Sequence, residues 1–124
     1  MAFLVLRAYL YLIVFDYYLQ RGNFAALYRK VRECPRNKDR PSPDAIVKVC
    51  GAVDMACVWY WKEVFCLQRS AVGACLLKRH GVAAQLIIGA QQVPFRAHAW
   101  VEVEGCVVND KPYMREMYAL LDRC

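Results

Sequence analysis

Several patterns that would assign a function directly are missing from this sequence. The chain has seven cysteines but no C-x-x-C pair, and an odd number of scattered cysteines fits neither a zinc ribbon nor a framework of disulfides. A glycine-rich phosphate-binding loop is also missing, as are internal repeats and low-complexity segments. We therefore expect no metal and no cofactor. We interpret most of the cysteines as small apolar residues of a protein in a reducing cytoplasm.

A continuous apolar run long enough to cross a bilayer, about 20 residues, is missing as well. Near the N-terminus, Arg7 and Asp16 interrupt the apolar sequence and leave only a short stretch, Ala8 to Phe15, between them. A secretory signal has its basic residue before the apolar stretch and a cleavage site of small residues after it. Here Arg7 lies within the apolar sequence, and Tyr17 and Tyr18 follow the stretch. We expect a helix that is buried against the rest of the domain or against a partner, in preference to the alternative of membrane contact.

Charge and length set further limits. The net charge of +6 includes one cluster of basic residues, Arg29 to Arg40. Neither aromatic residues that could stack on bases nor a known nucleic-acid-binding motif accompany this cluster, so nucleic-acid binding is not expected. A chain of 124 residues suits one domain with its own core. Within it we distinguish N-terminal apolar helices (1–33), which pack on the core or dock a partner, a proline-containing loop (34–42) and a core (43–124).

The spacing of apolar residues changes along the chain from a helical period to a strand period. Helices are predicted over residues 2–19, 24–32, from Ser42 onward, over 66–79 and over 114–122, and strands over 83–89, 96–104 and 106–110. Ser42, Pro43 and Asp44 form a helix start, because serine can cap free amides, proline suits the first turn and a carboxylate suits the dipole. The order predicts an α+β fold in which N-terminal helices precede a small antiparallel sheet.

Three residues in this order could perform covalent catalysis. Cys66 lies at the predicted start of a helix, where amide dipoles stabilise a thiolate. His98 lies in a predicted strand that can aim its imidazole at the thiol as a general base. Asp110 ends the next strand and can orient the imidazole ring. Glu102 is a rival for that orienting role, but it lies roughly 13 Å from His98 along the strand.

The hairpin between the last two predicted strands decides whether Asp110 can reach His98. With a two-residue turn, Val103 would face Cys106, and Asp110 would lie on the sheet face away from His98. With a three-residue loop (104–106), Asp110 would share the face of His98 and lie within hydrogen-bonding reach of it. We therefore predict the three-residue loop.

Around these residues the sequence resembles a known family. The segments that carry the resemblance are Cys66–Ser70 (CLQRS), Leu76–Val82 (LLKRHGV), Leu86–Gly89 (LIIG), Ala97–Val103 (AHAWVEV) and Asn109–Asp110. In their order and spacing they are similar to the stand-alone transglutaminase-like B proteins of lasso peptide biosynthesis. The similarity covers about residues 43–110 and implies a transglutaminase-like (papain-like) cysteine peptidase fold.

The resemblance implies a leader peptidase, which removes the N-terminal leader from a ribosomally synthesised precursor so that a separate cyclase can close the lasso. It carries Cys66, His98 and Asp110 over as the catalytic triad. Because the chain opens directly on a predicted helix, it resembles the split form of the family, in which a separate leader-recognition protein acts in trans. The implied partners are the precursor leader and that protein, with the cyclase as a further candidate, in the bacterial cytoplasm.

Three more residues become candidates for supporting the active site. Arg69 and Ser70 lie one helical turn beyond Cys66 and could orient the active-site loop or contact the peptide, although either could equally be a surface residue. Trp100 shares the predicted face of His98 and could shield an ion pair from water, or could serve packing alone.

The residues leave the oxyanion donor and the reaction class open. No glutamine occurs in residues 59–65, so backbone amides at the helix start are expected to stabilise the oxyanion, with Gln68 as a weaker alternative. Two other functions remain open: a transglutaminase-like acyltransferase that uses the same triad, and a non-catalytic adaptor in which the Cys66 thiol reacts slowly at neutral pH.

Overall fold

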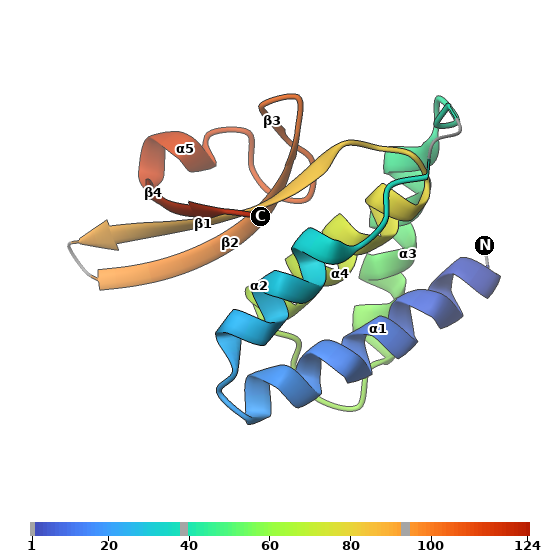
Figure 1. Ribbon diagram of the computed structural model, residues 1–124, viewed down its shortest axis with the longest axis horizontal. Coiled ribbons are helices and arrows are strands. Elements are labelled where there is room, and N and C mark those ends of the chain that lie inside the picture. Colours follow the sequence, from blue (N-terminus) through green and yellow to red (C-terminus); the bar gives the residue numbers. More distant parts are fainter. Residues whose placement is uncertain (1, 38–39, 93–94) are drawn as a thin grey trace.

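The computed structural model describes residues 2–37, 40–92 and 95–124. Its elements are α1 (Ala2–Gln20), α2 (Phe24–Glu33), α3 (Ala45–Trp59), α4 (Cys66–Arg79), β1 (Ala84–Gln92), β2 (Phe95–Val103), β3 (Cys106–Val107), α5 (Met114–Met117) and β4 (Ala119–Arg123). Figure 1 shows α1 to α4 gathered on one side of the molecule and the sheet on the other. The fold is therefore α+β, with the N-terminal helices first, as predicted.

The four long helices enclose most of the apolar core. α1 packs against α3 and α4, and α4 in turn packs against β1 and β2. The middle of α4 is buried on all sides from Ser70 to Leu77, because it lies between the other helices and the sheet. α4 is thus the central element of the fold, and its N-terminal end emerges from the core at Cys66.

The sheet has four antiparallel strands in the order β3-β2-β1-β4. Alternate side chains of its central strands enter two different clusters. Leu86, Ile88, Ala99 and Val101 join the main core with the helices. Ile87 and Trp100 face the other way and pack with Met114 of α5 and with Tyr118. The sheet therefore has a helix-facing side and an α5-facing side.

The C-terminal segment differs from the predicted helix over 114–122. Helix α5 ends at Met117, and the chain continues as strand β4, which pairs with β1 from Ile87 to Ala90. A helix of nine residues would have left that edge of β1 without partners, whereas β4 satisfies its backbone groups. The predicted strand 106–110 is likewise shorter, since β3 ends at Val107.

The predicted helix start at Ser42 is also wrong. Helix α3 begins at Ala45 with Asp44 as the residue that precedes it, and no side chain caps its first turn. The Ser42 hydroxyl instead donates to the Asp44 carboxylate. A short polar side chain just before a helix can bond to a neighbouring side chain as well as to the backbone, and here it does the former.

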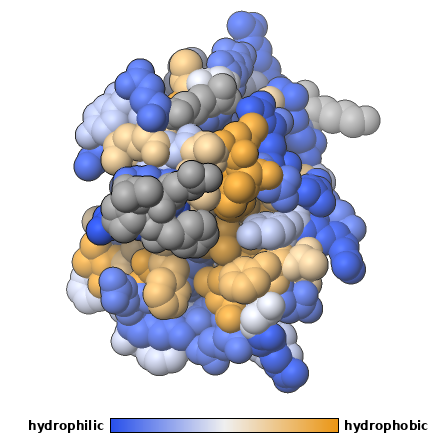
Figure 2. Space-filling view, turned by 90° about the vertical axis from the view of Figure 1, so that its left-hand side faces the viewer, coloured by the Kyte–Doolittle hydropathy of each residue, from blue (hydrophilic) through white to orange (hydrophobic). Residues whose placement is uncertain are grey.

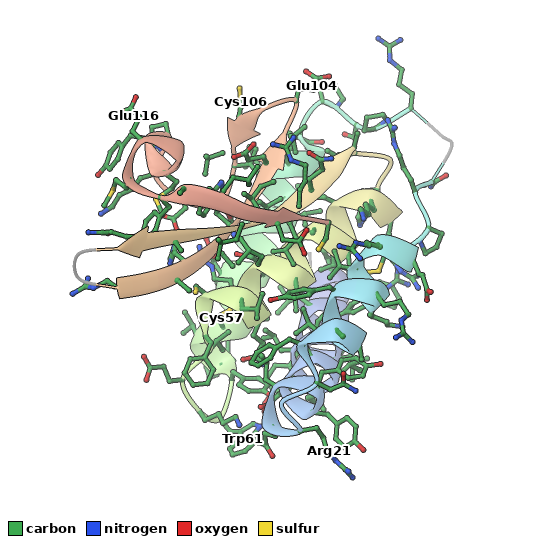
Figure 3. The ribbon with its side chains drawn as sticks, turned by 60° about the vertical axis from the view of Figure 1, so that its left-hand side comes forward. Arg21, Cys57, Trp61, Glu104, Cys106 and Glu116 are labelled. Atoms are coloured by element: carbon green, nitrogen blue, oxygen red, sulfur yellow. A yellow bond between two sulfur atoms is a disulfide. The ribbon has the colours of Figure 1, made fainter. Side chains whose placement is uncertain are left out.

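Five of the cysteines are free, but two form a disulfide that the sequence did not predict. Cys34, at the C-terminal end of α2, and Cys75, in α4, form a disulfide with their Cα atoms 5.6 Å apart, visible as a yellow bond in Figure 3. Cys75 is fully buried, as expected of a core residue, but it is not free. The pairing was missed because it joins residues 41 apart in sequence, and only the packing of α2 on α4 brings them together.

Helix α1 has a buried face and an exposed apolar face. Ala8, Leu12 and Phe15 are buried, whereas Phe3, Leu6 and Tyr17 are each more than half exposed. By length and composition α1 is the one described helix that could cross a membrane, but soluble core helices and signal sequences pass the same test. The expected burial against the domain is thus present on one face only.

A polar cluster joins the buried face of α1 to the segment between α3 and α4. Asp16, buried among apolar neighbours, accepts hydrogen bonds from the Tyr60 hydroxyl at 2.8 Å and pairs with Lys62 at 2.7 Å. Burial alone would raise the pKa of Asp16, but the hydrogen bonds from Lys62 and Tyr60 outweigh it, so the pKa lies below its usual value. Burial and the Asp16 carboxylate raise the pKa of Tyr60 to about 12.

We predict that Asp16→Ala destabilises the fold by about 2–4 kcal/mol, because it leaves the Tyr60 hydroxyl and the Lys62 ammonium without their buried acceptor. As a control, Asp54→Ala, which removes an exposed partner of Arg69, should cost about 0–1 kcal/mol. Urea unfolding at pH 7 measures both.

The Asp16→Ala variant also gives a pH test. The pKa of Asp16 in the folded protein is below its ordinary value of 3.8. Its contribution to the free energy of unfolding is therefore fully present above pH 3.8 and is lost as the pH falls through the lower pKa of the folded state. The stability difference between the wild type and Asp16→Ala should therefore shrink in that acid range. A difference that stays constant down to the lowest pH would contradict the role given to the carboxylate.

Candidate functional site

Cys66 is the first residue of α4, as predicted. Phe65 precedes it in an extended conformation, and no side chain caps the helix start. The amide groups of the first turn are therefore not occupied by a capping oxygen, and the positive end of the helix dipole lies at this end of α4. Cys66 is a free cysteine and is neither fully buried nor fully exposed.

His98 and Asp110 form the hydrogen bond that the sequence predicts. The His98 Nε2 atom lies 2.6 Å from the Asp110 Oδ2 atom, and both side chains are about three-quarters buried, with exposed fractions of 26% and 24%. A carboxylate only accepts hydrogen bonds, so Nε2 is the donor. This arrangement leaves Nδ1 of the ring as the nitrogen that can exchange a proton with a thiol.

The hairpin that brings them together is not the one predicted. Val103 pairs with Cys106, which makes Glu104 and Gly105 a two-residue turn, and both have positive φ angles, 52° and 80°, as in a type I′ turn. Figure 3 shows Glu104 and Cys106 at the tip of this hairpin. The predicted three-residue loop is therefore wrong, although the hydrogen bond that it was meant to explain is present.

Asp110 lies beyond the β2–β3 ladder, which has only two residue pairs. Regular pairing ends at Glu102 and Val107, followed by one more backbone bond from the Val108 N–H to the Val101 carbonyl at 3.0 Å. Beyond that point the chain leaves the sheet, and the alternation of faces no longer applies to it. Asp110 reaches His98 from a loop and not from a strand.

Asn109 holds this loop in place of the missing strand. Its side-chain oxygen accepts a hydrogen bond from the Val101 N–H at 2.7 Å, and its amide nitrogen donates to the Ser70 hydroxyl at 3.0 Å. The Ser70 hydroxyl donates to the Ala99 carbonyl at 3.1 Å. In the sequence Asn109 belongs to the segment that carries the family resemblance, and its position next to Asp110 is the signal for a positioning role.

Ser70 therefore joins three segments around the site. It is buried in α4, one turn beyond Cys66, and its two hydrogen bonds reach β2 and the loop before Asp110. The idea that it could be a plain surface residue is wrong. Since the element that carries Cys66 is bonded to the two segments that carry His98 and Asp110, Ser70 fixes their relative positions.

The Asp110 carboxyl is kept ionised by its surroundings. Burial raises its pKa, but the hydrogen bonds from His98 and from the Lys111 backbone N–H, together with the charge of His98, outweigh that effect. The pKa of Asp110 therefore lies below its ordinary value. An ionised carboxylate at this distance stabilises a positively charged imidazole ring.

Aromatic rings pack around the imidazole of His98. Trp100 lies on the same face of β2, with its ring centroid 6.2 Å from that of His98, and Tyr118 packs against both rings, 5.5 Å from His98 and 6.0 Å from Trp100. The buried Trp100 donates from its indole nitrogen to Glu102 at 2.8 Å. Glu102 is thus engaged with Trp100, and Asp110 holds the orienting position, as the distance argument favoured.

Gly89 lets these rings lie against the sheet. It pairs with His98 across the β1–β2 ladder, and a Cβ atom there would come within 2.6 Å of Trp100 and 2.8 Å of Tyr118. Any side chain at this position would displace one of the two rings. The glycine is therefore required by the aromatic packing behind His98.

Two other candidate residues are bonded to neighbouring helices. Arg69 pairs with Asp54 of α3 at 2.7 Å on the surface, so it braces two helices. Gln68 is fully buried and donates to the Leu12 carbonyl of α1 at 2.8 Å. Its side chain points into the helix packing, so the alternative of Gln68 as an oxyanion donor is wrong.

Cys66 and His98 line the same cavity, which has a volume of about 270 Å³. The two residues come from the start of α4 and from the middle of β2, and the strand and helix pack directly on one another. Among the described residues, no group of three or more histidine, cysteine or acidic side chains could hold a metal ion. The arrangement offers a thiol at a helix N-terminus, an oriented imidazole and a shared cavity, which suits nucleophilic attack on a carbonyl carbon.

Parts of the chain are similar in sequence to known proteins. The microcin J25-processing protein McjB of Escherichia coli is 39% identical to this chain over 56 residues, which are 45% of this chain and 27% of McjB. The chain therefore matches only about a quarter of that relative's length. No solved structure matches the chain. A family model described as the transglutaminase-like superfamily matches residues 9–122, and because that match covers nearly the whole chain, the protein belongs to the transglutaminase-like superfamily.

Proposed function

We propose that this protein is a cysteine peptidase that removes the leader from a ribosomally synthesised lasso peptide precursor. The observation that carries the proposal is the His98–Asp110 hydrogen bond of 2.6 Å beside the cavity that His98 shares with Cys66. A histidine oriented in this way has one ring nitrogen fixed by a carboxylate and the other available to a thiol. Cys66 is then the nucleophile, His98 the general acid and base, and Asp110 the orienting group.

The proposed reaction proceeds through a thioester. The Cys66 thiolate attacks the carbonyl carbon of the scissile peptide bond, and the C–N bond breaks as His98 gives its proton to the leaving amine. Water then attacks the thioester while His98 takes up one of its protons, and the leader leaves as a carboxylic acid. The protonated imidazole is stabilised by the ionised carboxylate of Asp110.

Backbone amides at the start of α4 would stabilise the oxyanion. No side chain caps these amides, and the free amides of a first turn point out of the helix at its N-terminal end, where Cys66 lies. Donors that are already oriented at a developing negative charge lower the barrier most effectively when water is excluded. The buried Trp100 and the ring of Tyr118 shield the far side of His98 from water.

The substrate and the partners are proposed from the one matching relative and from the family that the motifs resemble. The matching relative is described as a processing protein for microcin J25, and the motifs around Cys66 and His98 resemble leader peptidases of lasso peptide biosynthesis. We propose that the precursor leader is the substrate and that a separate leader-recognition protein delivers it in trans. The lasso cyclase is a further partner that would accept the product. A bacterial cytoplasmic location is part of this proposal.

A second function is supported by membership in the transglutaminase-like superfamily. The same thioester could be attacked by an amine instead of water, which would transfer the acyl group to a new amide bond. Product masses separate the two reactions. A released leader acid indicates hydrolysis, and an amide-linked adduct with an added amine indicates acyl transfer.

We predict that Cys66→Ala abolishes cleavage of the precursor peptide while the circular dichroism spectrum and thermal unfolding stay close to those of the wild type. Cys66 is at a helix end and only partly buried, so the loss of its sulfur leaves little empty space in the core. Cys106→Ala, at an exposed free cysteine, is the matched control and should retain full activity. Mass spectrometry of the reaction products gives the result, and full activity in Cys66→Ala would refute the proposal.

We predict that Asp110→Asn lowers kcat by about 100-fold or more, because a neutral amide neither stabilises the imidazolium nor fixes the ring tautomer. The matched control is Asp44→Asn, at an exposed aspartate that precedes α3. Steady-state cleavage rates measure the effect. Equal rates for the two variants would show that the Asp110–His98 hydrogen bond has no part in the reaction.

We predict that Asn109→Ala lowers both stability and kcat. The change leaves the Val101 N–H without its acceptor and costs about 1–3 kcal/mol, and it releases the loop that holds Asp110. KM should change less than kcat, since the residue positions a catalytic group and does not contact the peptide. An unchanged kcat in a variant with the expected loss of stability would limit Asn109 to a structural role.

A further inference from the structure

The cavity beside Cys66 is lined on most sides by apolar atoms. Its lining residues are Phe24, Tyr28, Cys66, Leu67, Ile88, Ala97, His98 and Ala99. No acidic or permanently charged side chain is among them. The space near the thiol therefore favours an apolar group and offers nothing to neutralise a charged one.

Two of the lining side chains come from the N-terminal helix α2. Phe24 is the first residue of α2, and Tyr28 follows one turn later, so both point from the same helix face. Because Leu67 belongs to α4 and Ile88, Ala97 and Ala99 to the sheet, the cavity lies where α2, α4 and the sheet meet. Figure 2 shows the side of the molecule from which the β1–β2 hairpin projects, and hydrophobic residues gather in the middle of that face.

The volume of the cavity fits one amino-acid side chain better than a separate small molecule. It is about 270 Å³, whereas sites for drug-sized ligands are commonly about 300–1,000 Å³. In a peptidase the substrate chain must pass the nucleophile with its scissile carbonyl against the thiolate. A side chain close to that carbonyl is then the group that can enter a cavity which the thiol itself lines.

We propose that this cavity binds one apolar side chain of the substrate, next to the bond that Cys66 attacks, and that Phe24 and Tyr28 of α2 determine which side chains fit. The proposal rests on the proposed peptidase function and adds its substrate class. It also gives α2 a place in the substrate site.

The position of α2 is fixed by contacts that do not involve the cavity. Leu27 and Val31 are fully buried in the main core. The disulfide between Cys34 and Cys75 joins the end of α2 to α4, and the Lys78 ammonium donates to the Val31 carbonyl at 2.7 Å. The wall formed by Phe24 and Tyr28 is therefore built into the free protein, which lowers the entropic cost of binding a side chain.

The first test needs no precursor and uses two thiol reagents. N-phenylmaleimide carries an apolar ring and iodoacetamide a small polar group, and peptide mapping by mass spectrometry reports the rate at Cys66 separately from the other cysteines. The preference for the apolar reagent is the ratio of the N-phenylmaleimide rate to the iodoacetamide rate at one cysteine. In the wild type we expect this preference to be higher at Cys66 than at the exposed Cys106. Phe24→Asp should lower that preference at Cys66 by about 10-fold.

The matched control for this test is Phe3→Asp. Phe3 is 72% exposed on α1 and Phe24 is 47% exposed on α2, so neither change should unfold the protein, and circular dichroism checks this. Phe3 is not part of the cavity, so its variant should keep the wild-type preference. An equal preference in the wild type and in Phe24→Asp would overturn the proposed pocket.

The second test uses precursor peptides in which one of the two residues that flank the cleavage site, the one before it or the one after it, is Leu, Ala or Lys. With the wild type, kcat/KM should fall from Leu to Ala to Lys at one of these positions. With Phe24→Asp the same position should accept Lys at least as well as Leu, because the new carboxylate can pair with the ammonium. Phe3→Asp should rank the peptides as the wild type does.

The outcomes separate the pocket from the peptidase. If the wild type and Phe24→Asp both cleave the peptides and rank them in the same order, the proposed pocket is overturned and the proposed peptidase function stands. No cleavage of any peptide would count against the peptidase, and the reagent test would then still decide whether the cavity selects apolar groups. A switch of ranking in Phe24→Asp alone supports both.

Discussion

The candidate site depends on how the chain leaves the sheet after β3. Regular pairing with β2 stops at Val107, and the Asn109 side chain then takes the place of a strand by binding the Val101 N–H and the Ser70 hydroxyl. Without those bonds Asp110 would belong to a free loop, and the 2.6 Å hydrogen bond to His98 would have no support from the rest of the fold. The short ladder and the amide that ends it are thus the constraint on which the oriented imidazole depends.

His98 contacts an aromatic cluster and also lines the cavity of the candidate site. On the α5-facing side, Trp100 and Tyr118 pack around the imidazole, and Gly89 leaves room for them. His98 also lines, together with its neighbours Ala97 and Ala99 in β2, the cavity that includes Cys66. Since α2 also borders the cavity, the N-terminal helices belong to the same structural unit as the proposed nucleophile, and a division at the loop 34–42 would separate two walls of one cavity.

Local sequence signals predicted the parts of the fold that depend on local chemistry. Helix α4 begins at Cys66 and ends at Arg79 as predicted, because an apolar periodic segment there ends in basic residues and a glycine. Longer-range features were beyond such signals. The Cys34–Cys75 disulfide needs the packing of α2 on α4. The strand β4 needs the open edge of β1. With the two-residue turn 104–105, Asp110 can still bind His98 because the residues after Val107 leave the ladder and no longer alternate between the sheet faces.

The central claim is that Cys66 attacks the precursor and carries the leader as a thioester. The most direct measurement is the intact mass of the protein after mixing with precursor and quenching in acid within the first turnover, followed by mapping of the modified residue. The account predicts an added mass equal to the leader acid minus one water, located at Cys66 and absent in His98→Ala. Cleavage of the precursor by protein in which Cys66 has been fully alkylated would contradict it.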